Sequence, residues 1–186
     1  MQFLRDENVI VLEFLPKGHS TGRQEPIAQV IGDKYFSLLE VVVRRDTDLK
    51  PGDKVYIGEA KRDNIDHIKR RITTNDLTSF AKSELPFVVE KLVKENEPKF
   101  VNFFNTAQPI STRFHQLELI PGIGKKHLWD IIDERKKSPF TSFEDIKKRI
   151  KLMPDPANSV IKRIMEELES DNVRFRLFVA GPVRRF

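Results

Sequence analysis

The spacing of apolar residues changes twice along the chain, and each change predicts a boundary. Between residues 9 and 73, short runs rich in Val, Ile, Phe and Tyr are separated by turn residues, which is typical of β-strands. From Asn75 onward, apolar residues recur at the three- and four-residue intervals of amphipathic helices. Alternation returns at residues 173–179. The pattern therefore predicts a β-domain, a helical region and a C-terminal strand.

Residues 1–74 are predicted to form the β-domain. The expected strands are residues 9–15, 27–31, 35–45, 54–57 and 65–73. Glycine-containing turns are expected at residues 32–34 and 50–53. No helical pattern long enough for a parallel crossover separates these strands, so we expect a small antiparallel barrel, OB-like or SH3-like. With helices to follow, the predicted fold class is α+β.

Two helical regions are expected next. Residues 75–108 are predicted to be linker helices: one begins near Leu77, a second is capped by Ser83 with Pro86 in its first turn, and a third opens at Glu97. Residues 109–170 are predicted to form an all-α domain. Its first helix is expected to be capped by Ser111 or Thr112 and to end before residue 121.

The sequence Ile-Pro-Gly-Ile-Gly-Lys-Lys at residues 120–126 carries the strongest chemical signal. Gly122 and Gly124 allow positive φ and leave no Cβ between the backbone and a partner. Ile123 is expected to turn inward and anchor the turn. A helix is predicted to begin near Lys125, and its first N–H groups lack an intrahelical acceptor and lie at the positive end of the helix dipole. A phosphate oxygen fits that position, beside Lys125 and Lys126.

These residues resemble the hairpin of the helix-hairpin-helix family, in which a hydrophobic-Gly-hydrophobic-Gly core precedes basic residues. The resemblance implies sequence-independent contact with a nucleic-acid backbone through the amides of Gly122, Ile123 and Gly124, together with Lys125 and Lys126. The alternative is a helical turn with a glycine cap and two solvated lysines.

An internal repeat follows at an offset of 33 residues, which aligns residues 119–124 with residues 152–157. The apolar positions are kept, but both glycines are replaced, Pro156 has no N–H, and Asn158-Ser159 stands where the lysine pair was. We therefore expect a tandem helix-hairpin-helix domain whose first hairpin is intact and whose second is degenerate. The alternative is two helical hairpins that are alike by apolar patterning alone.

Charge adds a mild bias toward the C-terminus. The net charge is +5 overall, but residues 1–60 hold eight basic and ten acidic residues, whereas residues 171–186 hold four basic and one acidic. The four basic residues of that tail are Arg174, Arg176, Arg184 and Arg185. If the tail strand pairs with the barrel edge, its arginines join the nucleic-acid-binding surface; the alternative is a frayed basic tail.

Other functions find little support. The four histidines show no metal-ligand spacing, there is no cysteine, and no catalytic constellation is visible, so we expect no metal, no cofactor and no enzyme. The glycine-containing loop at residues 16–25 lacks the spacing of a phosphate-binding P-loop, and a surface loop is expected there. No signal peptide or membrane span is apparent, and a cytoplasmic location away from membranes is expected.

The order of barrel, linker helices, paired hairpins and basic tail resembles an archaeal domain-of-unknown-function family of predicted RNA-binding proteins. That resemblance implies a preference for RNA over DNA and supplies no catalytic residues. The sequence thus predicts a sequence-independent nucleic-acid-binding protein. A protein–protein adaptor and a metal-dependent nuclease are the alternatives.

Overall fold

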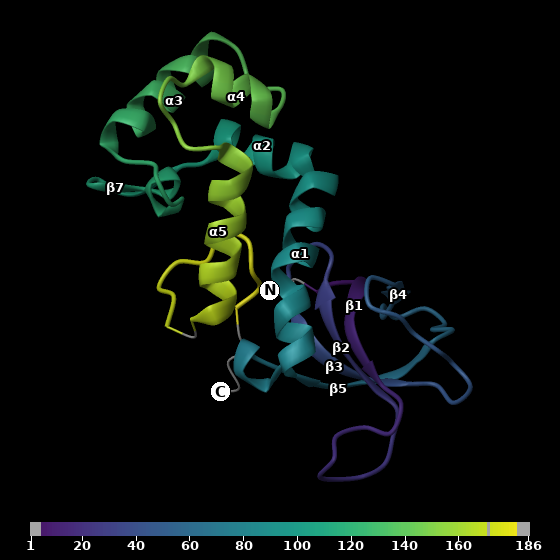
Figure 1. Ribbon diagram of the computed structural model, residues 1–186. Helices are drawn as coiled ribbons and strands as arrows, with labels where there is room; N and C mark the ends of the chain where they lie inside the picture. The colour runs from purple at the N-terminus through teal and green to yellow at the C-terminus, as the bar shows by residue number, and fades with distance from the viewer. Residues whose placement is uncertain (1–4, 171, 182–186) are drawn as a thin grey trace. The chain divides into compact units, whose positions relative to one another are not determined.

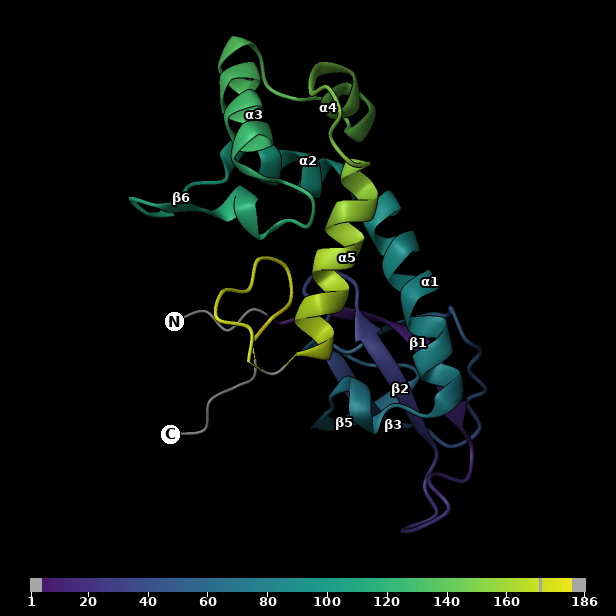
Figure 2. The ribbon, with the colours of Figure 1, turned by 60° about the vertical axis from the view of Figure 1, so that its left-hand side comes forward.

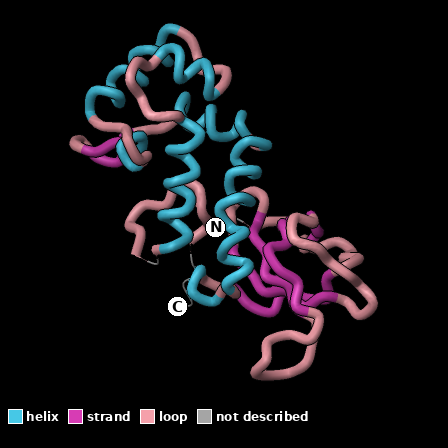
Figure 3. Tube along the Cα trace, in the orientation of Figure 1, coloured by secondary structure: helices cyan, strands magenta, loops and turns pink. Residues whose placement is uncertain are grey.

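The structure, a computed structural model, describes residues 5–170 and 172–181. The chain divides into two compact units, Met1–Val88 with Glu167–Phe186 (unit 1) and Val89–Glu166 (unit 2). Unit 1 contains a curled antiparallel sheet and unit 2 is mainly helical, so the α+β class is confirmed (Figure 3). The boundaries differ from the sequence-based division at residues 74, 108 and 170, because two long helices each run from one unit into the other.

Unit 1 is built on five strands, all of which the sequence predicted. They are β1 (Asn8–Leu15), β2 (Ile27–Gly32), β3 (Leu38–Val43), β4 (Lys54–Tyr56) and β5 (Ile65–Arg71). The sheet order is β4-β1-β2-β3-β5 with every described pair antiparallel. The sheet curls into a half-barrel (Figure 1). A β-bulge between Val11 and Glu13 in β1 adds to this curvature, as extra residues in one strand do.

Small branched side chains fill the inside of the curl. The core cluster consists of Val9, Val11, Ala28, Val30, Val41, Val43, Leu49, Val55, Ile57 and Ile65. β3 is shorter than the predicted 35–45, because Phe36 adopts a positive φ of 54° and the chain turns before the strand begins. The buried carboxylate of Asp6 holds this turn by accepting hydrogen bonds from the backbone N–H groups of Lys34, Tyr35 and Ser37.

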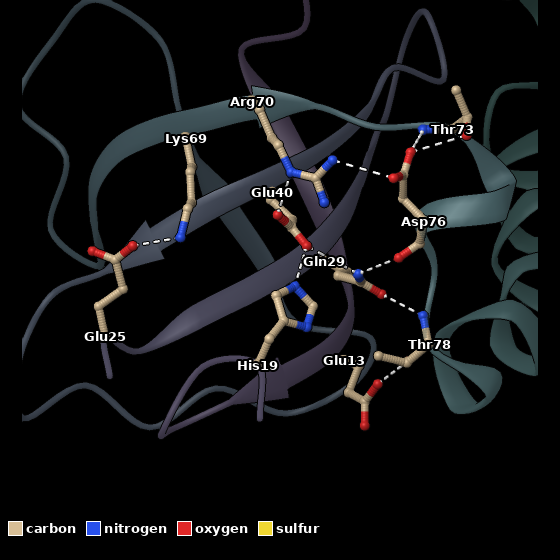
Figure 4. Close-up of polar contacts among 10 residues, drawn as sticks. All are labelled: Glu13, His19, Glu25, Gln29, Glu40, Lys69, Arg70, Thr73, Asp76 and Thr78. Atoms are coloured by element: carbon tan, nitrogen blue, oxygen red, sulfur yellow. Dashed lines mark hydrogen bonds and ion pairs between the residues drawn. The ribbon is translucent and has the colours of Figure 1, made fainter. Parts of the chain in front are cut away.

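A buried polar network ties the sheet to its surroundings (Figure 4). Glu40 on β3 is 1% exposed, and its carboxylate meets Arg70 of β5 at 2.8 Å and His19 of the 16–25 loop at 2.6 Å. Burial by itself raises the pKa of Glu40, but the hydrogen bonds from Arg70, His19 and Gln29 outweigh it and hold that pKa below its ordinary value. The loop at residues 16–25 is therefore fastened to the sheet by a polar anchor.

The start of helix α1 (Ser79–Glu95) corrects the sequence analysis. A 3-10 turn, η1 (Thr74–Asp76), precedes it. Ser83 does not cap a second helix, because α1 continues through Pro86 and the Ser83 hydroxyl donates to the Phe80 carbonyl within it. Thr78 takes the capping role, since its Oγ accepts from the backbone N–H of Ala81 at 3.1 Å. A continuous buried stripe outweighs the hydrogen bond lost at Pro86; its members are Ala81, Leu85, Val88, Val89 and Leu92.

Unit 2 has a turn followed by a helix at each of the two predicted hairpin positions, but the helix predicted before the first turn is missing. Its elements are α2 (Glu97–Thr106), β6 (Pro109–Ser111), β7 (Phe114–His115), the 3-10 turn η2 (Gln116–Leu119), α3 (Lys125–Lys137), α4 (Phe143–Arg149) and α5 (Pro156–Glu169). Neither Ser111 nor Thr112 caps a helix, because β6 and β7 form a small hairpin there. His115 caps η2 instead. The helix expected before residue 121 is thus one short 3-10 turn.

Half-buried side chains of α2 and α3 connect the elements of unit 2, and Figure 2 shows α3 and α4 at the same end of it. Asn105 of α2 accepts from and donates to the backbone of Phe140, which lies between α3 and α4. Arg135 of α3 donates to the carbonyls of Phe104 and Ala107, the otherwise unpaired end of α2. These contacts fix the end of α3 that lies away from the residue 120–126 turn.

The C-terminal segment of unit 1 is not the predicted strand. Residues 173–181 have no strand structure, although their apolar residues Phe178 and Val179 are buried. The buried carboxylate of Glu167 accepts hydrogen bonds from the N–H groups of Leu177, Phe178 and Val179. Because these N–H groups donate to a side chain rather than to a neighbouring strand, the strand predicted from the alternating pattern does not form.

Candidate functional site

The turn at residues 120–124, here called the first hairpin, is a tight backbone structure that depends on one glycine with positive φ. Gly122 has a φ of 86°, whereas Gly124 has a φ of −89° and an extended ψ, so only Gly122 uses the positive φ that both glycines allow. Ile123 is buried, as expected, and its N–H donates to the Ile120 carbonyl at 3.1 Å. The turn is therefore anchored by Ile123 and shaped by Gly122.

The first hairpin packs directly against its repeat. A Cβ placed on Gly122 would lie 2.6 Å from Cγ of Pro154, which belongs to the turn at residues 153–157, here called the second hairpin. A Cβ on Gly124 would meet nothing within 4 Å. Gly122 is thus required by packing between the two hairpins, while Gly124 faces open space.

The N-terminus of α3 has unsatisfied backbone donors. Gly124 is the N-cap, and its carbonyl accepts the first helical hydrogen bond, from the N–H of Leu128 at 2.9 Å. Within residues 5–170 and 172–181, no side chain accepts a hydrogen bond from the N–H groups of Lys125, Lys126 or His127. These three donors point out of the helix end at its positive pole. The arrangement can bind an anion.

The two lysines beside this helix end differ. Lys125 Nζ lies 2.7 Å from a carboxylate oxygen of Glu118 and donates to the carbonyl of Arg113 at 3.1 Å. Burial by itself raises the pKa of Glu118, but Lys125 and the backbone N–H of His115 outweigh it and lower that pKa. Lys126 is exposed and forms no ion pair with any residue that the structure describes. Lys126 is therefore the cation available to a ligand, and Lys125 is partly neutralised.

The second hairpin satisfies its own helix end. The carboxylate of Asp155 accepts from the backbone N–H of Asn158 at 3.0 Å, and Pro156, the first residue of α5, has no N–H. Asp155 stands at the position that aligns with Gly122. The positive φ has moved to Leu152, at 60°. A carboxylate of the chain itself thus accepts from the N-terminus of α5, whereas no described side chain does so at α3.

The tail arginines are not all part of one surface. The Arg176 guanidinium donates to the carbonyls of Glu167, at 2.6 Å, and Ser170, at 3.0 Å, so it caps the C-terminal end of α5. Arg174 is exposed, with its guanidinium 5.1 Å from the centre of the Phe175 ring. Arg184 and Arg185 lie outside the described residues. The structure therefore gives Arg176 a structural role.

Sequence reasoning missed three residues near the hairpins. Glu118 and Asp155 act through contacts that the hydrophobic pattern does not reveal. Trp129 is the only tryptophan of the chain, and the structure leaves it 59% exposed on α3. Its exposure was foreseeable, because the buried residues Leu128 and Ile131 place position 129 on the opposite side of the helix.

The described part of the chain holds neither a candidate metal site nor a membrane-spanning helix. No group of three or more His, Asp or Glu residues is arranged to hold a metal ion there. Among the same residues, no helix is long and apolar enough to cross a membrane.

Comparisons with known proteins place the chain in a family. Residues 5–180 match a family described as "Protein of unknown function (DUF655)". An uncharacterised protein from Methanocaldococcus jannaschii is 45% identical over 170 residues, which cover 91% of this chain and 77% of that protein. The crystal structure of Af1531 from Archaeoglobus fulgidus is similar with a TM-score of 0.84 and 46% identity, covering 94% of this chain and all of the other. The chain therefore belongs to the DUF655 family.

Proposed function

We propose that this protein binds nucleic acid, with RNA favoured over DNA, through the phosphate backbone and without sequence preference. The binding site is the first hairpin and the N-terminus of α3. In this proposal the two hairpins are a tandem helix-hairpin-helix pair, of which the first is active and the second degenerate. The curled sheet of unit 1 is an OB-like barrel.

The observation that carries the proposal is the difference in capping between two repeated helix ends. At α3, the N–H groups of Lys125, Lys126 and His127 have no acceptor among the described side chains, whereas at α5 a carboxylate of the chain itself accepts from Asn158. A phosphate oxygen is a suitable acceptor for three converging N–H groups at a positive helix pole. A helix end without a cap has lower stability, and an external anion can supply the missing acceptor.

Two further features favour a polyanion. Gly124 has open space around its Cα, so a phosphate can approach the backbone without meeting a side chain. Lys126 is exposed next to the free N–H groups and can supply a charge-assisted contact. Both features act on phosphate and not on bases, which predicts binding that is independent of sequence.

Substituting Gly124→Asp tests the proposal directly. The N-cap geometry of Gly124 suits an aspartate, whose carboxylate would then accept from the α3 N–H groups and occupy the phosphate position. We expect affinity for random-sequence RNA, measured by filter binding, to fall at least about tenfold while thermal stability is kept or raised. Binding should also weaken with salt in the wild-type chain.

The matched control is Ala157→Asp, which makes the same change of charge at the aligned position of the second hairpin. Its affinity should stay within about twofold of wild type. Equal losses in the two variants would show that net charge alone matters and would refute the assignment of the first hairpin. A wild-type chain that binds neither RNA nor DNA at low salt would instead favour the protein-adaptor function, and metal-dependent cleavage would favour a nuclease.

A further inference from the structure

The exposed ring of Trp129 calls for an explanation. Tryptophan is highly buried on average, because its large apolar surface is costly to leave in water. Yet Trp129 is 59% exposed on α3, four residues beyond the first residue of that helix. At 1.5 Å per residue, Trp129 lies about 6 Å along the helix axis from Lys125, the first residue with a free N–H group.

Three of the four neighbours of Trp129 on the helix surface are charged. Residues three and four positions apart are adjacent on a helix, which places Lys125 and Lys126 on one side and Asp133 with the half-buried Ile132 on the other. The other exposed residues of α3 are Lys125, Lys126, Asp133, Lys136 and Lys137. Trp129 is thus a single aromatic ring on an otherwise charged helix surface.

This setting does not suit an apolar protein partner. Hydrophobic interfaces require a contiguous apolar patch, and beside Trp129 the helix α3 offers only Ile132, which is half-buried. A flat ring beside the exposed Lys126 is instead a combination that suits single-stranded nucleic acid, because the lysine can contact the backbone while the ring stacks on a base. A ligand that carries both phosphate and an aromatic base matches both kinds of group at once.

The direction of the side chain favours the same ligand. Side chains on a helix tilt toward its N-terminus, so a residue covers the surface over the turn that precedes it. The ring of Trp129 is therefore expected over the turn that holds Lys125 and Lys126, on the side of the free N–H groups.

We propose that Trp129 is a base-stacking residue and that the ligand is a single-stranded or unpaired segment of nucleic acid. One phosphate binds at the N-terminus of α3 beside Lys126, and an unpaired base of the same strand stacks on the Trp129 ring. This inference rests on the proposed function, since it needs the phosphate site next to the ring. It adds a selection for unpaired bases that a phosphate site alone does not provide.

The experiment uses the full chain and its only tryptophan as the probe. A random-sequence single-stranded RNA of about ten nucleotides, and the same RNA in a duplex, are titrated while tryptophan emission is followed. We expect the single strand to quench the emission and to bind about tenfold more tightly than the duplex. Trp129→Ala should lose about tenfold in affinity for the single strand, as is usual for one stacked base, with little change for the duplex.

Three comparisons separate stacking from other effects. Trp129→Phe should keep most of the affinity, because a phenyl ring still stacks. Trp129→Ala should leave the slope of log affinity against log salt unchanged, because no phosphate contact is lost. The control is Phe87→Ala, which removes a ring that is 68% exposed on the unit 1 part of α1 and should not alter binding.

The possible failures are distinguishable. Unchanged single-strand affinity in Trp129→Ala, or equal binding of single strand and duplex without quenching, overturns the stacking role; if Gly124→Asp still abolishes binding, the phosphate site stands. Absence of binding by the wild-type chain overturns both. Should Trp129→Ala fold poorly by circular dichroism, the quenching and the Trp129→Phe affinity decide.

Discussion

The two hairpins of unit 2 align at an offset of 33 residues, but the helices that follow them, α3 and α5, begin differently. The first leaves the N–H groups of Lys125, Lys126 and His127 without a side-chain acceptor among the described residues. The second closes its helix with Asp155 and begins it with Pro156, which has no N–H. The comparison teaches that a helix end satisfied within the chain contributes to stability, whereas an unsatisfied one remains available for binding.

The two turns also pack against each other, and only one glycine of the first turn takes part in this contact. Gly122 of the first hairpin lies against Pro154 of the second, so each turn is part of the other's support. Gly124, two residues later, has no such neighbour. The glycines of one short motif thus serve different purposes: Gly122 maintains the fold and Gly124 leaves the helix end accessible.

The largest effect is expected for Gly122→Val. A β-branched residue at a φ of 86°, with its Cβ 2.6 Å from Pro154, is strained and overpacked at once. The free energy of unfolding should fall by about 3 kcal/mol. Denaturant titration by circular dichroism measures it. Gly124→Val is the control and should cost less than about 1 kcal/mol, since its φ is negative, although it should weaken RNA binding.

Removing the cap of the second hairpin should have an intermediate effect. Asp155→Ala leaves the N–H of Asn158 without its carboxylate, and the loss of such a cap costs about 1 kcal/mol of stability. RNA affinity should not rise, because Pro156 still lacks an N–H and no lysine pair follows it. A clear gain in affinity would show that self-capping alone silences the second hairpin, and the comparison would need revision.

Replacing Lys125 and replacing Lys126 should change the salt dependence of RNA affinity to different extents. Lys126→Gln should make the slope of log affinity against log salt shallower by about one unit, the loss of one phosphate contact. Lys125→Gln should change it less, because Lys125 is paired with Glu118 before any ligand arrives. Neither change should alter stability by more than about 0.5 kcal/mol. Binding isotherms at four salt concentrations are sufficient, and equal slopes for the two variants would remove the distinction.

The smallest effect is expected for Ala157→Val, the counterpart of Gly124→Val. The second hairpin makes no phosphate contact in the proposed function, so RNA affinity should stay within about twofold of wild type. The free energy of unfolding should change by less than about 1 kcal/mol, the difference in helix propensity. A loss of affinity as severe as that of Gly124→Val would mean that both hairpins bind.

Local patterns gave the strands of unit 1 and the start of α3, because both depend on residues close in sequence. They failed where a distant side chain decides the structure. The alternation in residues 173–179 is typical of a strand, but the carboxylate of Glu167 takes the N–H groups that a strand would need. Ser83 and Pro86 were expected to begin a helix, yet the buried stripe of α1 carries the helix through them.

The candidate site was predictable to a similar degree. The glycine–lysine motif located the first hairpin, since its chemistry is local. The different roles of its two lysines and of its two glycines were not predictable. The pairing of Lys125 with Glu118 and the contact of Gly122 with Pro154 both depend on how the chain folds back.

The helices α1 and α5 each belong to both units, since one crosses from residue 88 to 89 and the other from residue 166 to 167. Helix formation is cooperative, so melting of the unit 1 part of either helix removes hydrogen-bonded neighbours from the unit 2 part. Loss of structure in one unit is thereby transmitted through the backbone to the other. We therefore expect the two units to unfold together in a single transition.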